Sequence, residues 1–147
     1  MMPDGGPGNE RGPGDDAERG SGPADETAYD LLRRGTALLA KRHHAQAAVV
    51  LQRAAALEPR RGSILEPLGR AYFMSGQLER ALETFTALLD VDPTAHYGHY
   101  ALGRTLARLG RTREARTHLR LALALSPTSR LYRGALERLG PAERPGE

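Results

Sequence analysis

The sequence predicts an all-α fold, an α-solenoid of three helix-turn-helix repeats followed by a capping helix. Four residue types recur three times with a period of 34 residues, and apolar residues within each unit follow helical spacing. The recurring residues are the glycines Gly35, Gly69 and Gly103, the alanines Ala47, Ala81 and Ala115, the bulky apolar residues Leu51, Phe85 and Leu119, and the prolines Pro59, Pro93 and Pro127. A repeat of this length indicates supersecondary units that stack on one another.

The segment before the repeats has a different composition. Residues 1–24 contain seven glycines and four prolines, and no aromatic or branched apolar residue. We expect a disordered tail, because this segment cannot bury enough apolar surface to offset the entropy of ordering. The tail is acidic, since residues 1–27 carry seven acids and two arginines. The sequence shows no apolar run typical of a signal peptide or a bilayer span, so a cytoplasmic location is expected.

The repeats themselves are predicted to span residues 28–61, 62–95 and 96–129. In each first helix, unit positions 4, 7, 8 and 11 share one face, which in the second unit carries Leu65, Leu68, Gly69 and Tyr72. The small residues at positions 8 and 20 allow two antiparallel helices to approach closely, and the bulky residue at position 24 fills the remaining space.

Glycine and proline predict where the helices end. Gly76 and Gly110 fall where the first helices of units two and three stop, because glycine readily takes the left-handed conformation at a helix end. Unit one has Arg42 there, which takes that conformation less comfortably. The recurring prolines end the second helices. Pro67 lies inside the first helix of unit two, so that helix is predicted to begin late, near Ile64 or Leu65.

The segment after the third repeat reads as one further helix over residues 130–140. Its predicted buried side carries Leu131, Ala135, Leu136 and Leu139, and charged residues occupy the rest. A terminal element of a solenoid covers the last apolar face and presents a polar face to water, so we interpret this helix as a cap. Residues 141–147 are expected to fray.

The second unit also resembles the tetratricopeptide repeat family, through Leu68-Gly69, Tyr72, Ala81, Phe85 and Pro93. The resemblance covers residues 28–129 and implies a right-handed solenoid that binds other proteins. Some positions depart from the family pattern. The tryptophan position holds Leu31, Leu65 and His99, Arg34 replaces the leucine before the first glycine, and Leu38 and Leu106 replace the tyrosine.

The resemblance further implies a concave groove on the first helices that holds an extended or helical peptide. The residues that it places in this groove are Tyr29, Leu32, Thr36, Leu39, Glu66, Arg70, Phe73, Met74, Tyr97, Tyr100, Arg104 and Arg108. Arginines beside aromatic residues and a methionine suit a peptide with both acidic and apolar residues. The alternative for Leu32, Leu39, Phe73 and Tyr100 is that they only complete the packing between units.

The sequence favours a non-catalytic adaptor, with another protein as partner through a peptide segment and a homo-oligomer as a further option. Family members that bind chaperone tails use lysine and asparagine where this chain has Leu32 and Thr36, so that role is not expected. Cysteine is absent, no phosphate-binding loop is present, and no enzyme activity, cofactor or metal is expected. His96 and His99 with Asp92 make a weak metal candidate, because a metal site needs three or four converging ligands.

Charge leaves one alternative open. Residues 28–147 carry nineteen basic and eleven acidic groups, and nine arginines lie between Arg104 and Arg138. The simpler interpretation is a solvated helical exterior. The alternative is binding of nucleic acid or another polyanion through the arginine-rich C-terminal half, although no recognition motif for nucleic acid is present.

Overall fold

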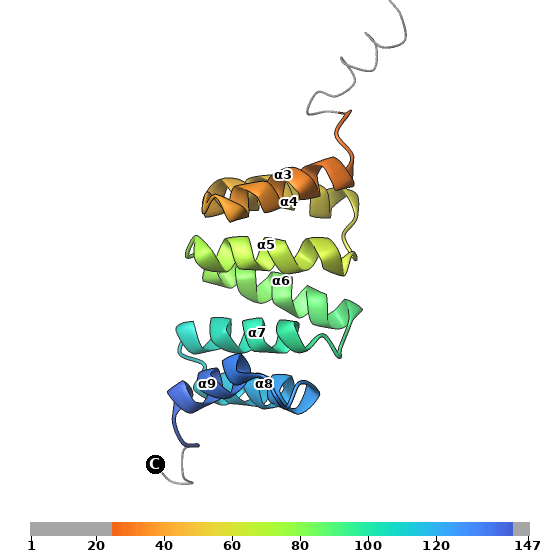
Figure 1. Cartoon of the computed structure of the whole chain (residues 1–147). Helices are drawn as coiled ribbons and strands as arrows, with labels where there is room; N and C mark the ends of the chain where they lie inside the picture. Colours follow the sequence, from red (N-terminus) through yellow and green to blue (C-terminus); the bar gives the residue numbers. More distant parts are fainter. Residues whose placement is uncertain (1–24, 143–147) are drawn as a thin grey trace, which may run out of the picture.

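The computed structural model describes residues 25–142, which form seven α-helices (Figure 1). The predicted tail 1–24 and residues 143–147 of the predicted C-terminal tail lie outside the described residues. The helices are α3 (Ala28–Ala40), α4 (His44–Leu57), α5 (Gly62–Met74), α6 (Leu78–Val91), α7 (His96–Arg108), α8 (Thr112–Leu125) and α9 (Arg130–Leu139).

The helices stack in the order in which they occur along the chain. Each helix packs against the next, and α3, α5, α7 and α9 also contact one another in succession. Among the described helices, no pair further apart in the sequence makes contact. The result is an elongated stack of helical hairpins (Figure 1). The predicted all-α solenoid is therefore confirmed.

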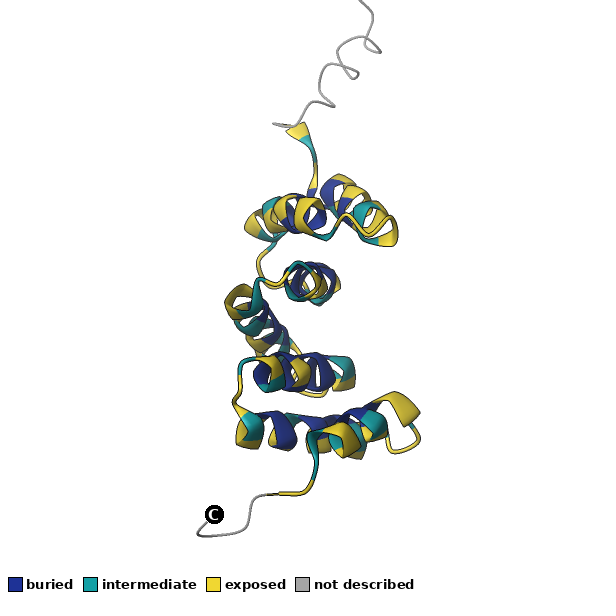
Figure 2. Cartoon of the chain, turned by 90° about the vertical axis from the view of Figure 1, so that its left-hand side faces the viewer, coloured by how far each residue is buried: buried dark blue, intermediate teal, exposed yellow. Residues whose placement is uncertain are grey.

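Pairs of small and bulky residues hold each hairpin together. A Cβ atom added to Gly69 would lie 2.4 Å from the ring of Phe85, and one added to Gly35 would lie 2.4 Å from Leu51. Each glycine thus leaves room for the bulky side chain of the partner helix. The bulky residues and the recurring alanines are all buried. Figure 2 shows that buried residues lie on the sides of the helices that face their neighbours.

The three first helices end in the same way. Gly76 and Gly110 have φ angles of 81° and 82°, and Arg42 takes a φ of 64° at the equivalent place. In unit one the amide of His43 donates to the carbonyl of Leu38 over 2.9 Å, and the equivalent bonds in units two and three are 2.8 and 2.9 Å long. The left-handed ends predicted at the two glycines are confirmed, and Arg42 adopts that conformation without being a glycine.

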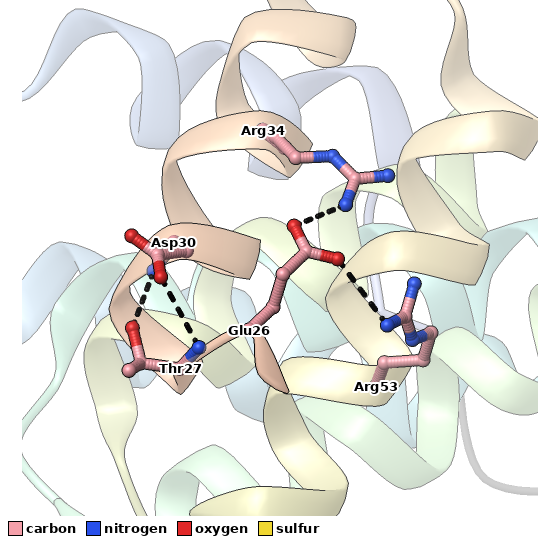
Figure 3. Close-up of polar contacts among 5 residues, drawn as sticks. All are labelled: Glu26, Thr27, Asp30, Arg34 and Arg53. Carbon is pink, nitrogen blue, oxygen red and sulfur yellow. Dashed lines mark hydrogen bonds and ion pairs between the residues drawn. The ribbon is translucent and has the colours of Figure 1, made fainter. Parts of the chain in front are cut away.

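The start of α3 is fixed by polar contacts (Figure 3). Thr27 and Asp30 form a capping box, in which each side chain accepts a hydrogen bond from the other residue's amide. The carboxylate of Glu26 lies between Arg34 of α3 and Arg53 of α4, and pairs with both. The hydrogen bond from Arg34 and the charges of both arginines hold the pKa of Glu26 below its usual value, against the opposing effect of burial. Arg34 departs from the family pattern, and its ion pair with Glu26 ties the segment before α3 to the first hairpin.

Pro67 does not delay the start of α5. The helix begins at Gly62, and the carbonyl of Arg61 accepts hydrogen bonds from the amides of Ile64 and Leu65, each over 3.0 Å. The predicted late start is wrong. Pro67 removes only the one helical hydrogen bond that its own missing N–H would make, while the first turn buries Ile64 and Leu65. Packing of that turn therefore outweighs the local preference of proline.

The buried face of α9 also differs from the prediction. Leu131 is 53% exposed, whereas the next residue, Tyr132, is 5% exposed and stacks on Tyr100 with ring centroids 4.9 Å apart. The Tyr132 hydroxyl lies 2.7 Å from Nδ1 of His96. The placement of Leu131 on the buried side is thus wrong, because the helix turns its larger aromatic residue inward. Ala135 is buried as predicted.

Candidate functional site

A pocket of about 140 Å³ opens on the side of the stack formed by the first helices. Seven of the twelve predicted groove residues line it, and they come from α3, α5 and α7. They are Leu39, Arg70, Phe73, Met74, Tyr97, Tyr100 and Arg104. Because most of these side chains are apolar or aromatic and two are arginines, the pocket combines an apolar lining with positive charge.

Phe73 organises the positive charge. The guanidinium carbon of Arg104 lies 5.0 Å from the centre of the Phe73 ring, and that of Arg108 lies 5.3 Å from the same centre. Arg104 also lies 5.8 Å from the Tyr100 ring and donates a hydrogen bond of 3.3 Å to its hydroxyl. Contacts of this kind hold an arginine in place and leave most of its N–H groups available.

No carboxylate forms an ion pair with these arginines within the described part of the chain, although the charge of Glu66 also acts on Tyr97. The ion pairs found in residues 25–142 involve Arg34, Arg53, Arg61 and Arg111, but none of the arginines of the pocket. The guanidinium groups at this site are therefore available to pair with a carboxylate brought by a ligand.

Tyr97 adds a neutral hydrogen-bond donor. Its ring lies 5.8 Å from that of Tyr100, and burial raises its pKa to about 12 even though the charges of Arg70 and Arg104 lower it. The phenol is consequently protonated at neutral pH. It can donate a hydrogen bond to an anionic or carbonyl oxygen in the pocket.

The other predicted residues lie outside the pocket lining. Tyr29 is 66% exposed and stacks under the guanidinium of Arg33. The hydroxyl of Thr36 donates to the carbonyl of Leu32 over 2.9 Å, so it is engaged with its own helix. The side chain of Leu32 packs against the core. Unit one therefore contributes only Leu39 of its four predicted residues.

The two remaining predicted residues belong to units two and three. Glu66 is half-buried, and Arg108 lines a neighbouring pocket.

Tyr100 both lines the pocket and packs between units, so neither of the two alternatives that the sequence left open excludes the other. Its side chain lines the pocket, yet it is 5% exposed and belongs to the core cluster beneath α9. It is therefore not the exposed aromatic residue that the groove prediction implied. Leu39 and Phe73 also combine a place in the pocket with packing against the core.

Sequence reasoning missed His44, which also lines the pocket. This residue begins α4, and its Nδ1 atom is buried with no hydrogen-bond partner among the described residues. A buried ring nitrogen without a partner at a pocket is a natural contact for a polar group of a ligand. His44 begins a second helix, whereas the groove implied by the resemblance lies on the first helices, so the pattern does not indicate this residue. Phe85 and Ala101 complete the lining.

The remaining histidines make contacts of other kinds. Nε2 of His99 donates to the carbonyl of Pro93 over 2.8 Å, which leaves its Nδ1 to accept a bond from Nδ1 of His118 over 3.1 Å. In residues 25–142, no group of three or more histidine, aspartate and glutamate side chains is arranged to hold a metal ion. None of the helices in this range is long and apolar enough to cross a membrane.

Comparison with known proteins agrees with this architecture. A family profile described as tetratricopeptide repeat matches residues 32–87 and 67–130. The chain is 33% identical to human Superkiller complex protein 3 over a match of 92 residues. The matched segment makes up 63% of this chain and 6% of that protein. The chain thus spans only a small part of this relative.

Solved structures show the same fold. The first TPR domain of Spaghetti (RPAP3), bound to the HSP90 peptide SRMEEVD, is 15% identical and superposes with a TM-score of 0.73 over 77% of this chain and 90% of that chain. YrrB, described as a TPR protein with an unusual peptide-binding site, is 26% identical with a TM-score of 0.73 over 76% of this chain and 58% of that chain. The profile covers more than half of the sequence, and the chain belongs to the tetratricopeptide repeat family.

Proposed function

We propose that this protein is a non-catalytic adaptor that binds a peptide segment of a partner protein in the pocket between α3, α5 and α7. The observation that carries the proposal is the cluster around Phe73, where Arg104 and Arg108 lie over the ring without a carboxylate partner among the described residues. An apolar side chain of the peptide would enter the pocket, and an acidic neighbour would pair with the arginines.

Related structures support a peptide as the ligand. The RPAP3 domain is described as bound to an HSP90 peptide, and YrrB is described as having a peptide-binding site. The ligand proposed here is not a chaperone tail, because Leu32 and Thr36 occupy the positions that would require lysine and asparagine. Leu32 packs against the core and the Thr36 hydroxyl donates to its own helix, so neither offers a polar group to a peptide carboxylate.

The proposal can be tested by selecting ligands from a phage-displayed library of random peptides. We expect selected peptides to contain acidic and apolar residues and to bind the wild-type protein saturably in fluorescence anisotropy. Arg70→Glu and Arg104→Glu should each weaken binding at least about 10-fold, because each places a negative charge where the peptide carries one.

The matched control is Arg120→Glu, an equal change of charge at an exposed position of α8 outside the pocket lining. It should weaken binding less than about 3-fold. Circular dichroism should show equal helicity in all variants. Peptides that bind the pocket variants as tightly as the wild type, or a library that yields no saturable ligand, would refute the adaptor proposal.

Binding of nucleic acid or another polyanion is the second candidate, and two features of α8 and its N-cap weaken it. Arg116 is buried and donates to the carbonyls of Gly140 and Pro141. Its guanidinium therefore binds the end of the cap and is not exposed to a polyanion. Arg111 is paired with Glu114. A gel-shift series in rising salt separates the candidates, since binding to a polyanion falls steeply with salt and is not competed by the selected peptides.

A further inference from the structure

A second pocket, of about 200 Å³, lies next to the first and shares Arg104 with it. It lies between α7 and α9, which contact each other at the C-terminal end of the stack (Figure 1). Its charged lining residues are Arg104, Arg108 and Arg138, and its apolar ones include Ala135 and Leu139. No aspartate or glutamate is part of this lining. Positive charge is thus concentrated in one small concave site.

Arg138 continues a row of arginines along the first helices. It follows Arg104 by one repeat length, as Arg104 follows Arg70. Gly134 lies one turn before it on α9, and a Cβ atom added there would be 3.3 Å from Nη1 of Arg138. The guanidinium therefore lies back along its own helix, over a residue without a side chain. Arg138 belongs to the side of α9 that adjoins α7, and not to a purely solvated surface.

The chemistry of this pocket suits an anion with more than one charge. None of the ion pairs in the described range involves Arg104, Arg108 or Arg138. A carboxylate has two oxygens and matches one guanidinium fork. A phosphate monoester carries close to two negative charges at neutral pH and three acceptor oxygens, so it can engage several guanidinium groups at once. Arginine clusters are a common means of recognising phosphorylated motifs.

We propose that the pocket between α7 and α9 binds a phosphorylated serine or threonine side chain of the peptide whose apolar residue occupies the first pocket. The inference rests on the proposed function, since the phosphate would belong to the same peptide. Arg104 lines both pockets, so it contacts the peptide at the junction between the apolar residue and the phosphate. Arg108 and Arg138 complete the phosphate site.

The first arm of the test uses inorganic phosphate and needs no peptide. The full chain, labelled with ¹⁵N, is titrated with phosphate and, at matched ionic strength, with chloride, while the side-chain Nε–H signals of the arginines are followed by NMR. Arg104, Arg108 and Arg138 should shift together and saturably with phosphate. Arg130, which is exposed on α9 and outside the pocket, should not. Equal responses to phosphate and chloride, or no saturation, would overturn the inference.

The second arm uses three degenerate peptide libraries with acidic and apolar flanks, which differ only in a central serine, phosphoserine or glutamate. Wild type should retain the phosphoserine library at least about 10-fold more strongly than the other two, since charge-assisted bonds to phosphate are lost in both. Arg138→Gln should remove this preference, and Arg130→Gln should keep it. Circular dichroism confirms that both variants fold.

The outcomes separate the two proposals. Retention of all three libraries to the same extent, or of glutamate as strongly as phosphoserine, overturns the phosphate site and leaves the peptide-binding function intact. A preference that survives in Arg138→Gln also overturns the assignment. If no library is retained while phosphate still shifts the three arginines saturably, the adaptor function fails and the anion site stands.

Discussion

At unit position 4, where the other two units have leucine, the third unit has a buried histidine. His99 is 8% exposed, and both of its ring nitrogens have partners, the carbonyl of Pro93 and Nδ1 of His118. A buried polar group without partners destabilises the folded state, so these two bonds are what allow a histidine to take a packing position. The bond to His118 requires a particular tautomer, in which the neutral His118 donates from Nδ1.

This pair predicts a loss of stability below neutral pH. Burial lowers the pKa of His118 from its ordinary value of 6.5, the electrostatic influence of the neighbouring His99 ring adds to the effect, and the charge of Glu114 opposes it. Well above pH 6.5 both the folded and unfolded states hold a neutral His118. As the pH falls below that value, the unfolded state gains a proton first, so the free energy of unfolding decreases until the lowered pKa is passed.

Urea unfolding at pH 7.5 and 5.5 measures this decrease. His118→Gln removes the titrating group and should reduce the difference in unfolding free energy between the two pH values. His43→Gln, the same change at an exposed histidine, serves as the control and should retain the wild-type difference. A wild-type difference in His118→Gln would show that this side chain does not contribute to the pH dependence.

At the level of single elements, the three hairpin turns share one geometry but not one residue. Gly76, Gly110 and Arg42 all have positive φ, and the same pair of backbone hydrogen bonds closes each turn. The left-handed conformation costs a residue with a side chain roughly 1–2 kcal/mol. In unit one the hydrogen bonds and the packing of α3 against α4 compensate for that strain.

Replacing Arg42 by glycine should therefore stabilise the protein. We expect Arg42→Gly to raise the free energy of unfolding by about 0.5–1 kcal/mol, because relief of strain exceeds the entropy that glycine adds to the unfolded chain. Arg42→Ala keeps a Cβ atom and should give a value close to that of the wild type. Urea unfolding measures both. A gain in Arg42→Ala equal to that in Arg42→Gly would show that the arginine side chain, and not the backbone angle, is the source of strain.

The elements that the sequence predicted best are those fixed by backbone chemistry. Glycine readily takes the left-handed backbone conformation at a helix end, and the positive φ angles of Gly76 and Gly110 confirm the ends predicted there. Predictions that depended on tertiary packing were less successful. Pro67 locally disfavours a helix, but burial of the first turn of α5 outweighs that preference. The choice of Tyr132 over Leu131 as the buried residue depended on the place of Tyr100, which no local pattern reveals.

The candidate site could be predicted only in part, for similar reasons. The family resemblance implies that Phe73 and Arg104 share a groove on successive first helices, and the structure brings them into contact. His44 belongs to a second helix, and a groove expected on the first helices does not include it. The predicted repeats end at residue 129, so the pattern places charged residues of the capping helix, Arg138 among them, on its polar side. The relation of Arg138 to Arg104 was nevertheless present in the 34-residue spacing.

At the scale of the whole molecule, the two ends of the stack differ. At the C-terminal end, α9 covers Tyr100 and Leu119 through Tyr132 and Ala135. At the other end, Val49 of α4 is 62% exposed. Together with Leu38 and Val50 it lines a pocket on the first hairpin, and no described helix covers this pocket as α9 covers the other end. Helices contact only their neighbours in the stack, so the stability of each end depends on its own contacts.

This arrangement predicts that damage to the cap stays local. Tyr132→Ala removes a buried ring that stacks on Tyr100, and should lower the stability of the C-terminal helices by about 3–4 kcal/mol. Hydrogen exchange followed by NMR should show faster exchange of amides in α8 and α9, with little change in α3 and α4, because no contacts connect these two ends directly. Leu131→Ala, at the exposed neighbouring position, should change exchange rates little throughout. If Tyr132→Ala accelerated exchange equally in α3 and α9, the chain would unfold as one cooperative unit, and stability would not be divided among neighbouring hairpins.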